Sequence, residues 1–203
     1  MKSQSRRSFT QGLAALVAMF PFTSHGAGRR GGSGGGTVTA VEKSDLLFMR
    51  EEEKLARDVY ITMGEKWGNN IFFNIASSEQ KHMDAILNLL NKYKIADPTV
   101  GKGVGEFTNT ELQALYDSLV TMGEESALMA LQVGGIIEET DVEDIVAAIS
   151  RTNKTDIKNV YTNLLNGSYN HMRAFAGQIE SLTGAPYVAQ VISQEEVDKI
   201  LGK

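Results

Sequence analysis

The chain contains no cysteine among its 203 residues, so it can form neither a disulfide nor a thiolate metal site. Any metal that it binds must be held by oxygen atoms and imidazole nitrogens. Acids outnumber lysine and arginine, the net charge is −5, and the body of the chain has no long basic run. Because proteins that bind nucleic acids present a positive surface to the phosphates, we expect no nucleic-acid partner.

The N-terminal region lacks an apolar run long enough to cross a membrane as a helix. Its apolar run, GLAALVAMF at 12–20, is far shorter than the roughly 20 residues that a transmembrane helix needs. The run follows the paired Arg6 and Arg7 and precedes small residues around Gly26. This pattern resembles a twin-arginine export signal over residues 1–26. It predicts a periplasmic or secreted protein without a permanent membrane anchor.

Glycine is concentrated in the segment GRRGGSGGG at 28–36, which predicts a flexible linker over residues 27–43. These glycines are not followed by the Lys-Ser or Lys-Thr pair of a phosphate-binding loop, so we assign the segment no ligand. The remaining residues, 44–203, suffice for one domain with its own core but not for two large ones.

Apolar residues recur at spacings of three and four along most of residues 44–203, which is typical of amphipathic helices. Capping residues, glycines and prolines bound these segments. The predicted helices are one from Ser44 to Gly68, one from Ser77 or Ser78 to just before Asp97, a short one capped by Asn109 or Thr110, one over 124–150, one from Thr155 to Gly184, and a short one over 193–201. Four of them are long, and a long connection separates the second from the third. This predicts an all-α fold, a ferritin-like four-helix bundle with a crossover in the middle and short additional helices.

Each of the four long predicted helices carries possible metal ligands in line with its apolar positions. These are Glu53 on the first helix, Glu79 and His82 on the second, Glu138 on the third and His171 on the fourth. Burying an unpaired carboxylate costs several kcal/mol, and three carboxylates with two imidazoles cannot all neutralise one another. One or two divalent cations would satisfy all five groups. The sequence therefore predicts a metal site inside the bundle.

Other acidic residues and a tyrosine lie close in sequence to the predicted ligands but are not assigned as ligands. Glu51, Glu143 and Asp144 are expected on the surface. Glu52 fits either a surface acid or a partner of a metal ligand. Tyr60 could donate a hydrogen bond to a ligand, but a tyrosine between packed helices is more often part of the core with its hydroxyl at the edge.

Four stretches of the sequence resemble those of ferritin-like proteins. EKLARDVY at 53–60 and SEQKHMDA at 78–85 resemble the first two metal-binding helices of rubrerythrin-type ferritin-like proteins. EEEKLARDVY, GGIIEETDVEDI and GSYNHMRAF, in this order, more closely resemble an uncharacterised ferritin-like family, a numbered domain of unknown function. The resemblance covers about residues 44–182. It implies a ferritin-like fold and five metal ligands, namely Glu53, Glu79, His82, Glu138 and His171.

The resemblance breaks at Ser168, which occupies the position of a glutamate on the last metal-binding helix. A neutral hydroxyl is a poor ligand. Asp141, three residues after Glu138, could supply the missing oxygen, or Ser168 could hold a metal-bound water. Glu139 competes with Glu138 for the ligand role because both flank the apolar row, and the pattern favours Glu138.

Oxygen-rich ligands with one or two imidazoles suit iron and manganese best, and they also permit zinc. We expect oxygen or peroxide chemistry at a di-iron or di-manganese centre, which would make the protein an oxidoreductase. Without cysteine it has no rubredoxin-like module, so electrons would come from the metal or an external donor. Two alternatives remain: a non-catalytic metal-binding or sequestering protein, and a metal-free helical interaction module. A homodimer is also compatible with the sequence.

Overall fold

The computed structural model describes residues 37–203, which fold into six α-helices with no strand among them. The helices are α2 (Ala40–Trp67), α3 (Asn70–Tyr93), α4 (Thr110–Gly123), α5 (Ala127–Arg151), α6 (Thr155–Thr183) and α7 (Gln194–Leu201). The all-α class is thereby confirmed for the described residues. The predicted export signal at 1–26 and most of the predicted linker lie outside them.

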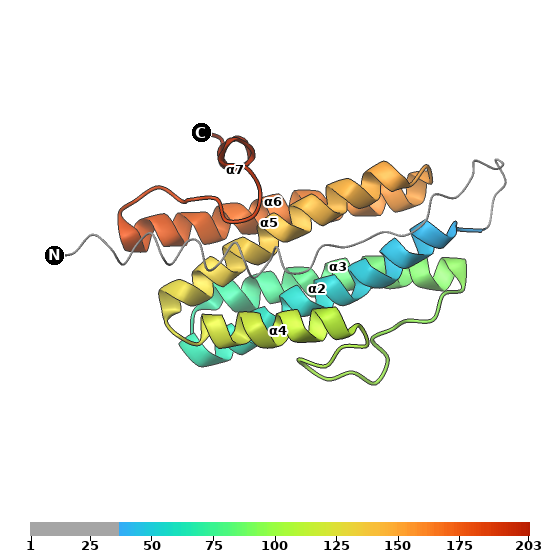
Figure 1. Cartoon of the computed structure of the whole chain (residues 1–203), viewed down its shortest axis with the longest axis horizontal. Helices are drawn as coiled ribbons and strands as arrows, with labels where there is room; N and C mark the ends of the chain where they lie inside the picture. Colours follow the sequence, from blue (N-terminus) through green and yellow to red (C-terminus); the bar gives the residue numbers. More distant parts are fainter. Residues whose placement is uncertain (1–36) are drawn as a thin grey trace.

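The four long helices lie side by side in two closely packed pairs, α2 with α3 and α5 with α6 (Figure 1). The pairs meet where α2 contacts α5 and where α3 contacts α6. Figure 1 also shows α4 running back along the molecule, so that α5 starts near the end at which α3 starts. The shorter α4 packs on α2 and α5, and α7 packs on α6.

Two helices begin earlier than the sequence pattern predicts. Helix α2 begins at Ala40 rather than after Ser44, because Thr39 and Glu42 form a capping box in which each side chain accepts the other's backbone N–H, at 3.1 and 2.8 Å. The predicted linker therefore ends four residues too late. Helix α3 begins at Asn70, about two turns before the predicted start, because the side chain of Asn69 accepts the N–H of Ile71 at 3.1 Å.

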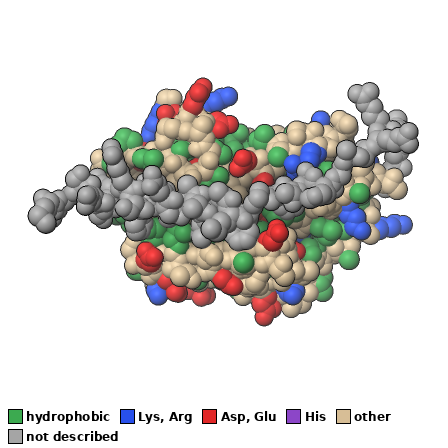
Figure 2. Space-filling model, in the orientation of Figure 1, with side chains coloured by type: hydrophobic (Ala, Val, Ile, Leu, Met, Phe, Trp, Pro, Cys, Tyr) green, Lys and Arg blue, Asp and Glu red, His purple; other side chains and the backbone are tan. Residues whose placement is uncertain are grey.

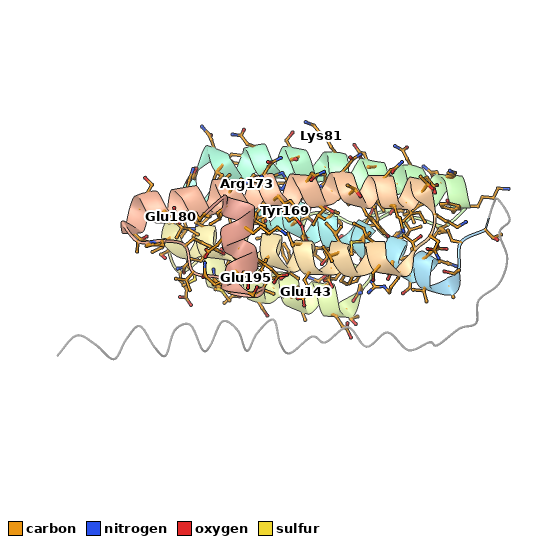
Figure 3. All side chains as sticks on the ribbon, turned by 90° about the horizontal axis from the view of Figure 1, so that it is seen from above. Lys81, Glu143, Tyr169, Arg173, Glu180 and Glu195 are labelled. Atoms are coloured by element: carbon orange, nitrogen blue, oxygen red, sulfur yellow. The ribbon has the colours of Figure 1, made fainter. Side chains whose placement is uncertain are left out.

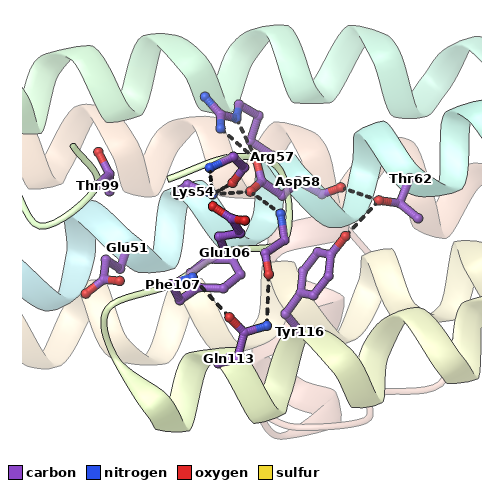
Figure 4. Close-up of polar contacts among 12 residues, drawn as sticks. Glu51, Lys54, Arg57, Asp58, Thr62, Thr99, Glu106, Phe107, Gln113 and Tyr116 are labelled. Atoms are coloured by element: carbon purple, nitrogen blue, oxygen red, sulfur yellow. Dashed lines mark hydrogen bonds and ion pairs between the residues drawn. The ribbon is translucent and has the colours of Figure 1, made fainter. Parts of the chain in front are cut away.

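The connection between α3 and α4 is held against α2 by buried charges (Figure 4). Lys54 forms an ion pair with Asp58, donates to the carbonyl of Gly103 at 2.6 Å and lies 4.6 Å from the ring centre of Phe107. Asp58 also accepts the N–H of Gly105 at 3.0 Å. These contacts place charged side chains inside the molecule without leaving them unpaired.

The prediction that Glu51 lies on the surface is wrong. Its carboxylate is buried and accepts the backbone N–H groups of Thr108 at 2.5 Å and Asn109 at 3.1 Å. Asn109, one of the two predicted capping residues, is the N-cap of α4, so Glu51 connects the beginning of α4 to α2. The helical pattern of α2 alone cannot show that a distant loop covers one of its polar positions.

The outside of the described fold carries both signs of charge, which are interspersed on the face drawn in Figure 2. No described helix combines the length and the apolar character needed to cross a membrane. The interior contains two separate clusters of buried apolar side chains. One includes Tyr60, Phe72 and Phe175, and the other includes Leu46 and Ile86.

Candidate metal centre

A layer of buried polar side chains separates the two apolar clusters. Along α2, Glu53 lies between Met49 of one cluster and Ala56 of the other. Helices α3 and α6 repeat this arrangement, and α5 adds a residue next to Ile137 of the first cluster. They contribute Glu79 and His82 from α3, Glu138 from α5 and His171 from α6. These side chains are almost completely buried. Glu79 and Glu138 are 0% exposed, His82 is 8% exposed and His171 is 7% exposed.

The five predicted ligands form two triads that share Glu79. In the first triad, His82 Nδ1 lies 2.7 Å from Glu79 Oε2 and 3.1 Å from Glu53 Oε2. In the second, His171 Nδ1 lies 2.7 Å from Glu79 Oε1 and 3.4 Å from Glu138 Oε2. Within each triad, the donor atoms all lie within 4.8 Å of one another, which is close enough to contact a common ion.

Several of these donor atoms have no hydrogen-bond partner. They are both carboxylate oxygens of Glu79, Glu138 Oε2 and His171 Nδ1. Of the short contacts within the triads, the one between His82 Nδ1 and Glu53 Oε2 is a hydrogen bond, whereas the contacts of these four atoms do not have hydrogen-bond geometry. Buried polar groups in folded proteins almost always have a partner, and an unsatisfied one costs about 1–3 kcal/mol. Oxygen and imidazole lone pairs that converge without hydrogen bonds fit a divalent cation.

Burial and neighbouring charges shift the pKa values of the triad side chains in opposite directions. Burial alone would lower the pKa of the histidines, but Glu53 and Glu79 raise that of His82 to about 10, and Glu138 and Glu79 raise that of His171 to about 11. Burial would raise the pKa of Glu79, but contacts with both histidines lower it to about 2. Burial raises the pKa of Glu53 to about 8, against the effect of His82. Without a cation, the nearby carboxylates favour the protonated form of both histidines at neutral pH, and a cation would displace these protons on binding.

The structure separates Glu138 from Glu139. Glu138 faces the second triad, whereas Glu139 faces the segment that follows α6. Its carboxylate accepts the hydroxyl of Tyr187 at 2.7 Å and the backbone N–H groups of residues 190, 191 and 192 at 2.9, 2.6 and 3.1 Å. Glu139 is therefore an anchor for this segment and not a member of the triads, because its oxygens are already fully used.

Tyr60 is completely buried, and its hydroxyl donates a hydrogen bond to Glu138 Oε1 at 2.6 Å. Burial and the adjacent Glu138 charge raise the pKa of this hydroxyl well above its ordinary value, so it remains a donor. The ring packs 5.2 Å from that of Phe175, measured between ring centres. Both interpretations of Tyr60 therefore apply: it belongs to the core and contacts a member of the second triad.

Asp141 and Glu52 are both buried next to the triads. Burial, followed by the charges of Glu53 and Glu138, raises the pKa of Asp141 well above its ordinary value. Burial and the charge of Asp144 do the same for Glu52. Glu52 is thus not a surface acid. The predicted surface position is right for Glu143, which is exposed, and only partly right for Asp144, which is half-buried.

Ser168 is completely buried, and its hydroxyl donates to the carbonyl of Leu164 in its own helix at 3.3 Å. The hydroxyl proton of Ser168 is therefore used in a hydrogen bond to the backbone. The adjacent Gly167 has a function that the sequence pattern did not suggest. A Cβ at this position would lie 2.4 Å from His82 Nε2, so only glycine leaves room for the imidazole. A glycine inside a helical pattern is the signal that could have indicated this contact.

Fold and site together define an all-helical protein with a buried carboxylate and histidine cluster. Residues 42–203 match the family described as "Uncharacterized protein domain (DUF2202)", and the chain belongs to this family. "Uncharacterized protein MJ0754" of Methanocaldococcus jannaschii is 48% identical over 164 residues, which cover 81% of this chain and 88% of that protein. The "Crystal structure of hypothetical protein MJ0754 from Methanococcus jannaschii DSM 2661" matches with a TM-score of 0.80 and 46% identity, and covers 85% of this chain and 98% of that one.

Proposed function

We propose that this protein is a ferritin-like metal-binding protein whose interior holds two divalent transition-metal ions. The two triads that share Glu79 support this proposal most directly. The fold supports it as well, because α2, α3, α5 and α6 pack together and α4 returns the chain between α3 and α5. This connectivity supports a ferritin-like four-helix bundle with a crossover between its second and third long helices.

In this proposal, Glu53, Glu79 and His82 hold one ion, and Glu79, Glu138 and His171 hold the other. Glu79 contributes one oxygen to each triad and bridges them. Oxygen ligands with one imidazole per ion suit iron and manganese best and also permit zinc. Asp141, which is buried and interacts with Glu53 and Glu138, is the candidate for a further carboxylate, since Ser168 offers only a hydroxyl that already donates to Leu164.

A pair of iron or manganese ions, when bound, supplies the electrons for reducing oxygen or peroxide. The chain itself supplies the surroundings of that chemistry. Tyr60 orients Glu138 through its hydrogen bond, and Phe72 and Phe175 pack beside the Tyr60 ring. The apolar clusters on both sides of the polar layer exclude water from it. We propose an oxidoreductase on this basis. Arg6, Arg7 and the following apolar run support export to the periplasm or beyond.

Ser168 favours a second candidate function, a non-catalytic protein that binds or sequesters metal. A hydroxyl engaged with its own helix leaves the centre with one bridging carboxylate instead of two. A less complete bridge would couple two redox ions less tightly. A metal-free interaction module agrees less well with the structure, because it leaves the buried oxygens of Glu79 without a hydrogen bond.

Metal analysis tests the proposed centre. Protein purified without chelator should contain about two equivalents of iron, manganese or zinc, and chelator should lower its melting temperature, because binding to the folded state alone adds stability. Less than a tenth of an equivalent, with melting unchanged by chelator, would exclude both metal-binding functions and leave the interaction module.

Oxygen or peroxide added after anaerobic loading with iron(II) separates the enzyme from the sequestering protein. Repeated consumption of the oxidant in the presence of an electron donor supports the oxidoreductase. A single colour change, in proportion to the iron and without turnover, supports sequestration instead. The experiment should be repeated with manganese(II), because the ligand set suits both metals.

A further inference from the structure

A row of acids runs along α5 from the candidate metal centre toward the surface. Glu138, Asp141 and Asp144 follow one another at spacings of three residues. Each step advances about 4.5 Å along the helix axis and turns about 60° around it, so the row extends over roughly 9 Å. Burial decreases along the row: Glu138 is 0% exposed, Asp141 is 2% exposed and Asp144 is half-buried. The row therefore winds from the interior of the molecule to solvent.

Glu52 of α2 lies opposite this row. Its side chain is 5% exposed and is in hydrogen-bonding contact with Asp144. The charges of Asp144 and Asp141 both act on Glu52, and the charge of Glu53 acts on Asp141. Asp144, Glu52 and Asp141, which we name the acidic file, thus connect the surface to the two triads.

Two buried oxygens of the acidic file, Glu52 Oε2 and Asp141 Oδ2, have no hydrogen-bond partner. A proton shared between Glu52 and Asp144 would explain the contact between these two residues, but it leaves the oxygen of Asp141 unsatisfied. Arg151, a cation that acts on Asp144, is engaged by Asp45 through two hydrogen bonds of 3.0 Å. Oxygen atoms without partners, in a row of acids, indicate a cation as the missing ligand.

We propose that the acidic file is the path by which divalent cations pass from solvent to the metal centre. This inference rests on the proposed function and adds how the centre is filled. Asp144 attracts the hydrated cation, and the oxygens of Glu52 and Asp141 replace its water on the way to Glu53 and Glu138. Among the described residues, the only groups close enough to hold an ion are the two triads. The acidic file is therefore suited to passage rather than storage.

The rate of cobalt binding tests this path. Metal-free full-length protein is mixed with excess Co²⁺ in a stopped-flow instrument, and the visible absorbance of bound cobalt is followed to its end point. Asp144→Asn and Glu52→Gln each replace a carboxyl group by an amide, a poorer ligand for a cation, with little change in volume, and both should bind cobalt about tenfold more slowly than the wild type. Asp144→Asn should reach the wild-type end point. Asp144→Lys, which reverses the charge, should be slower still.

Glu143→Gln is the matched control, because Glu143 is the exposed acid next to Asp144 on the outside of α5 (Figure 3). It should keep the wild-type rate. Wild-type rates in both Asp144→Asn and Glu52→Gln would overturn the path and leave the metal centre standing. Equal slowing in Glu143→Gln would overturn it too, since general surface charge would then explain the attraction. A wild-type protein that binds no cobalt would overturn the centre and the path together.

Circular dichroism checks that each variant is folded. If Glu52→Gln does not fold, the path is tested with the two substitutions of Asp144. That side chain is half-buried at the outer end of the acidic file, so its substitution should leave the fold intact. Their rates must then decrease in the order wild type, Asp144→Asn, Asp144→Lys. Any other order contradicts the path.

Discussion

Glu79 Oε1 lies 2.7 Å from Nδ1 of His171, although the two residues belong to different helices, α3 and α6. The other oxygen of the same carboxylate lies 2.7 Å from Nδ1 of His82. One buried carboxylate thus contacts both imidazoles. Glu79 is the element common to both triads, whereas Glu53 and Glu138 each belong to one.

This difference predicts unequal effects of two Glu→Gln substitutions. Glu79→Gln should remove metal from both positions, because each triad loses a charged ligand. Glu138→Gln should leave the triad of Glu53, Glu79 and His82 intact, so about half of the metal should remain. Elemental analysis of the purified variants measures this, with Glu125→Gln, an exposed substitution, as the control. Equal losses in both variants would contradict a shared Glu79.

Two glycines of α6 provide a matched test of how His82 is positioned. In Gly167→Ala the new Cβ would lie 2.4 Å from His82 Nε2, so the imidazole must move and metal affinity should fall about tenfold or more. Gly177→Ala meets nothing within 4 Å. It should bind metal normally and be more stable by about 0.5–1 kcal/mol, because alanine favours the helix. Competition with a coloured chelator measures the affinities. Normal metal affinity in Gly167→Ala would show that the ring position does not matter.

The hydrogen bond between Tyr60 and Glu138 predicts a selective loss of affinity. Tyr60→Phe removes the donor at 2.6 Å but keeps the ring that packs on Phe175. Groups that orient metal ligands typically contribute about 10–100-fold to affinity, so the binding step of the second triad should shift by roughly this factor and the other step should not. Calorimetric titration resolves the two steps. A shift of both steps, or of neither, would argue against a role confined to the second triad.

Stability of the metal-free protein should decrease as pH rises. The pKa values of His82 and His171 are raised to about 10 and about 11, from an ordinary value of 6.5. The folded state therefore keeps these protons when the unfolded chain has released them. This stabilisation is complete below about pH 6.5 and is lost as pH rises toward the folded-state values. The pKa of Glu53, raised from 4.5 to about 8, acts in the same direction between those values.

Thermal melting of chelator-treated protein between pH 6.5 and pH 10 measures this dependence, and the melting temperature should fall across the range. The slope should be smaller in His171→Gln, which removes one of the three shifted groups. A melting temperature that rises with pH would contradict the protonated state of the histidines. Metal affinity should change in the opposite sense and increase with pH, because bound ions displace these protons.

The contacts of Glu139 predict a loss of stability without a loss of metal. Glu139→Gln replaces a carboxylate that accepts the Tyr187 hydroxyl and three backbone N–H groups. Hydrogen bonds to a charged group contribute about 1.5–3 kcal/mol each, so the free energy of unfolding should fall by about 2–4 kcal/mol. Urea denaturation measures this, and limited proteolysis should cut the variant faster within residues 185–193. Loss of metal with unchanged stability would instead indicate that Glu139 is a ligand.

The helical period, together with the resemblance to ferritin-like proteins, was enough to predict the members of the two triads, with Glu139 left as an alternative to Glu138. Residues three and four apart share a helix face, so Glu79 and His82 had to face the same direction. Apolar neighbours on that face indicated that the direction was inward. The all-α class followed from equally local signals and is confirmed, and of the two predicted caps of α4, Asn109 and Thr110, the structure shows Asn109. Metal binding itself remains a prediction from these residues.

Tertiary structure alone decided which of two adjacent acids takes which position. Successive helical residues point about 100° apart, and a face defined by apolar spacing is broad enough to admit either. Glu139 turns away from the triads because the segment after α6 brings N–H donors to it. Glu51 is buried because the loop before α4 covers it, and Glu52 because Asp144 of α5 lies opposite. Such partners are distant in sequence, and no local pattern encodes them.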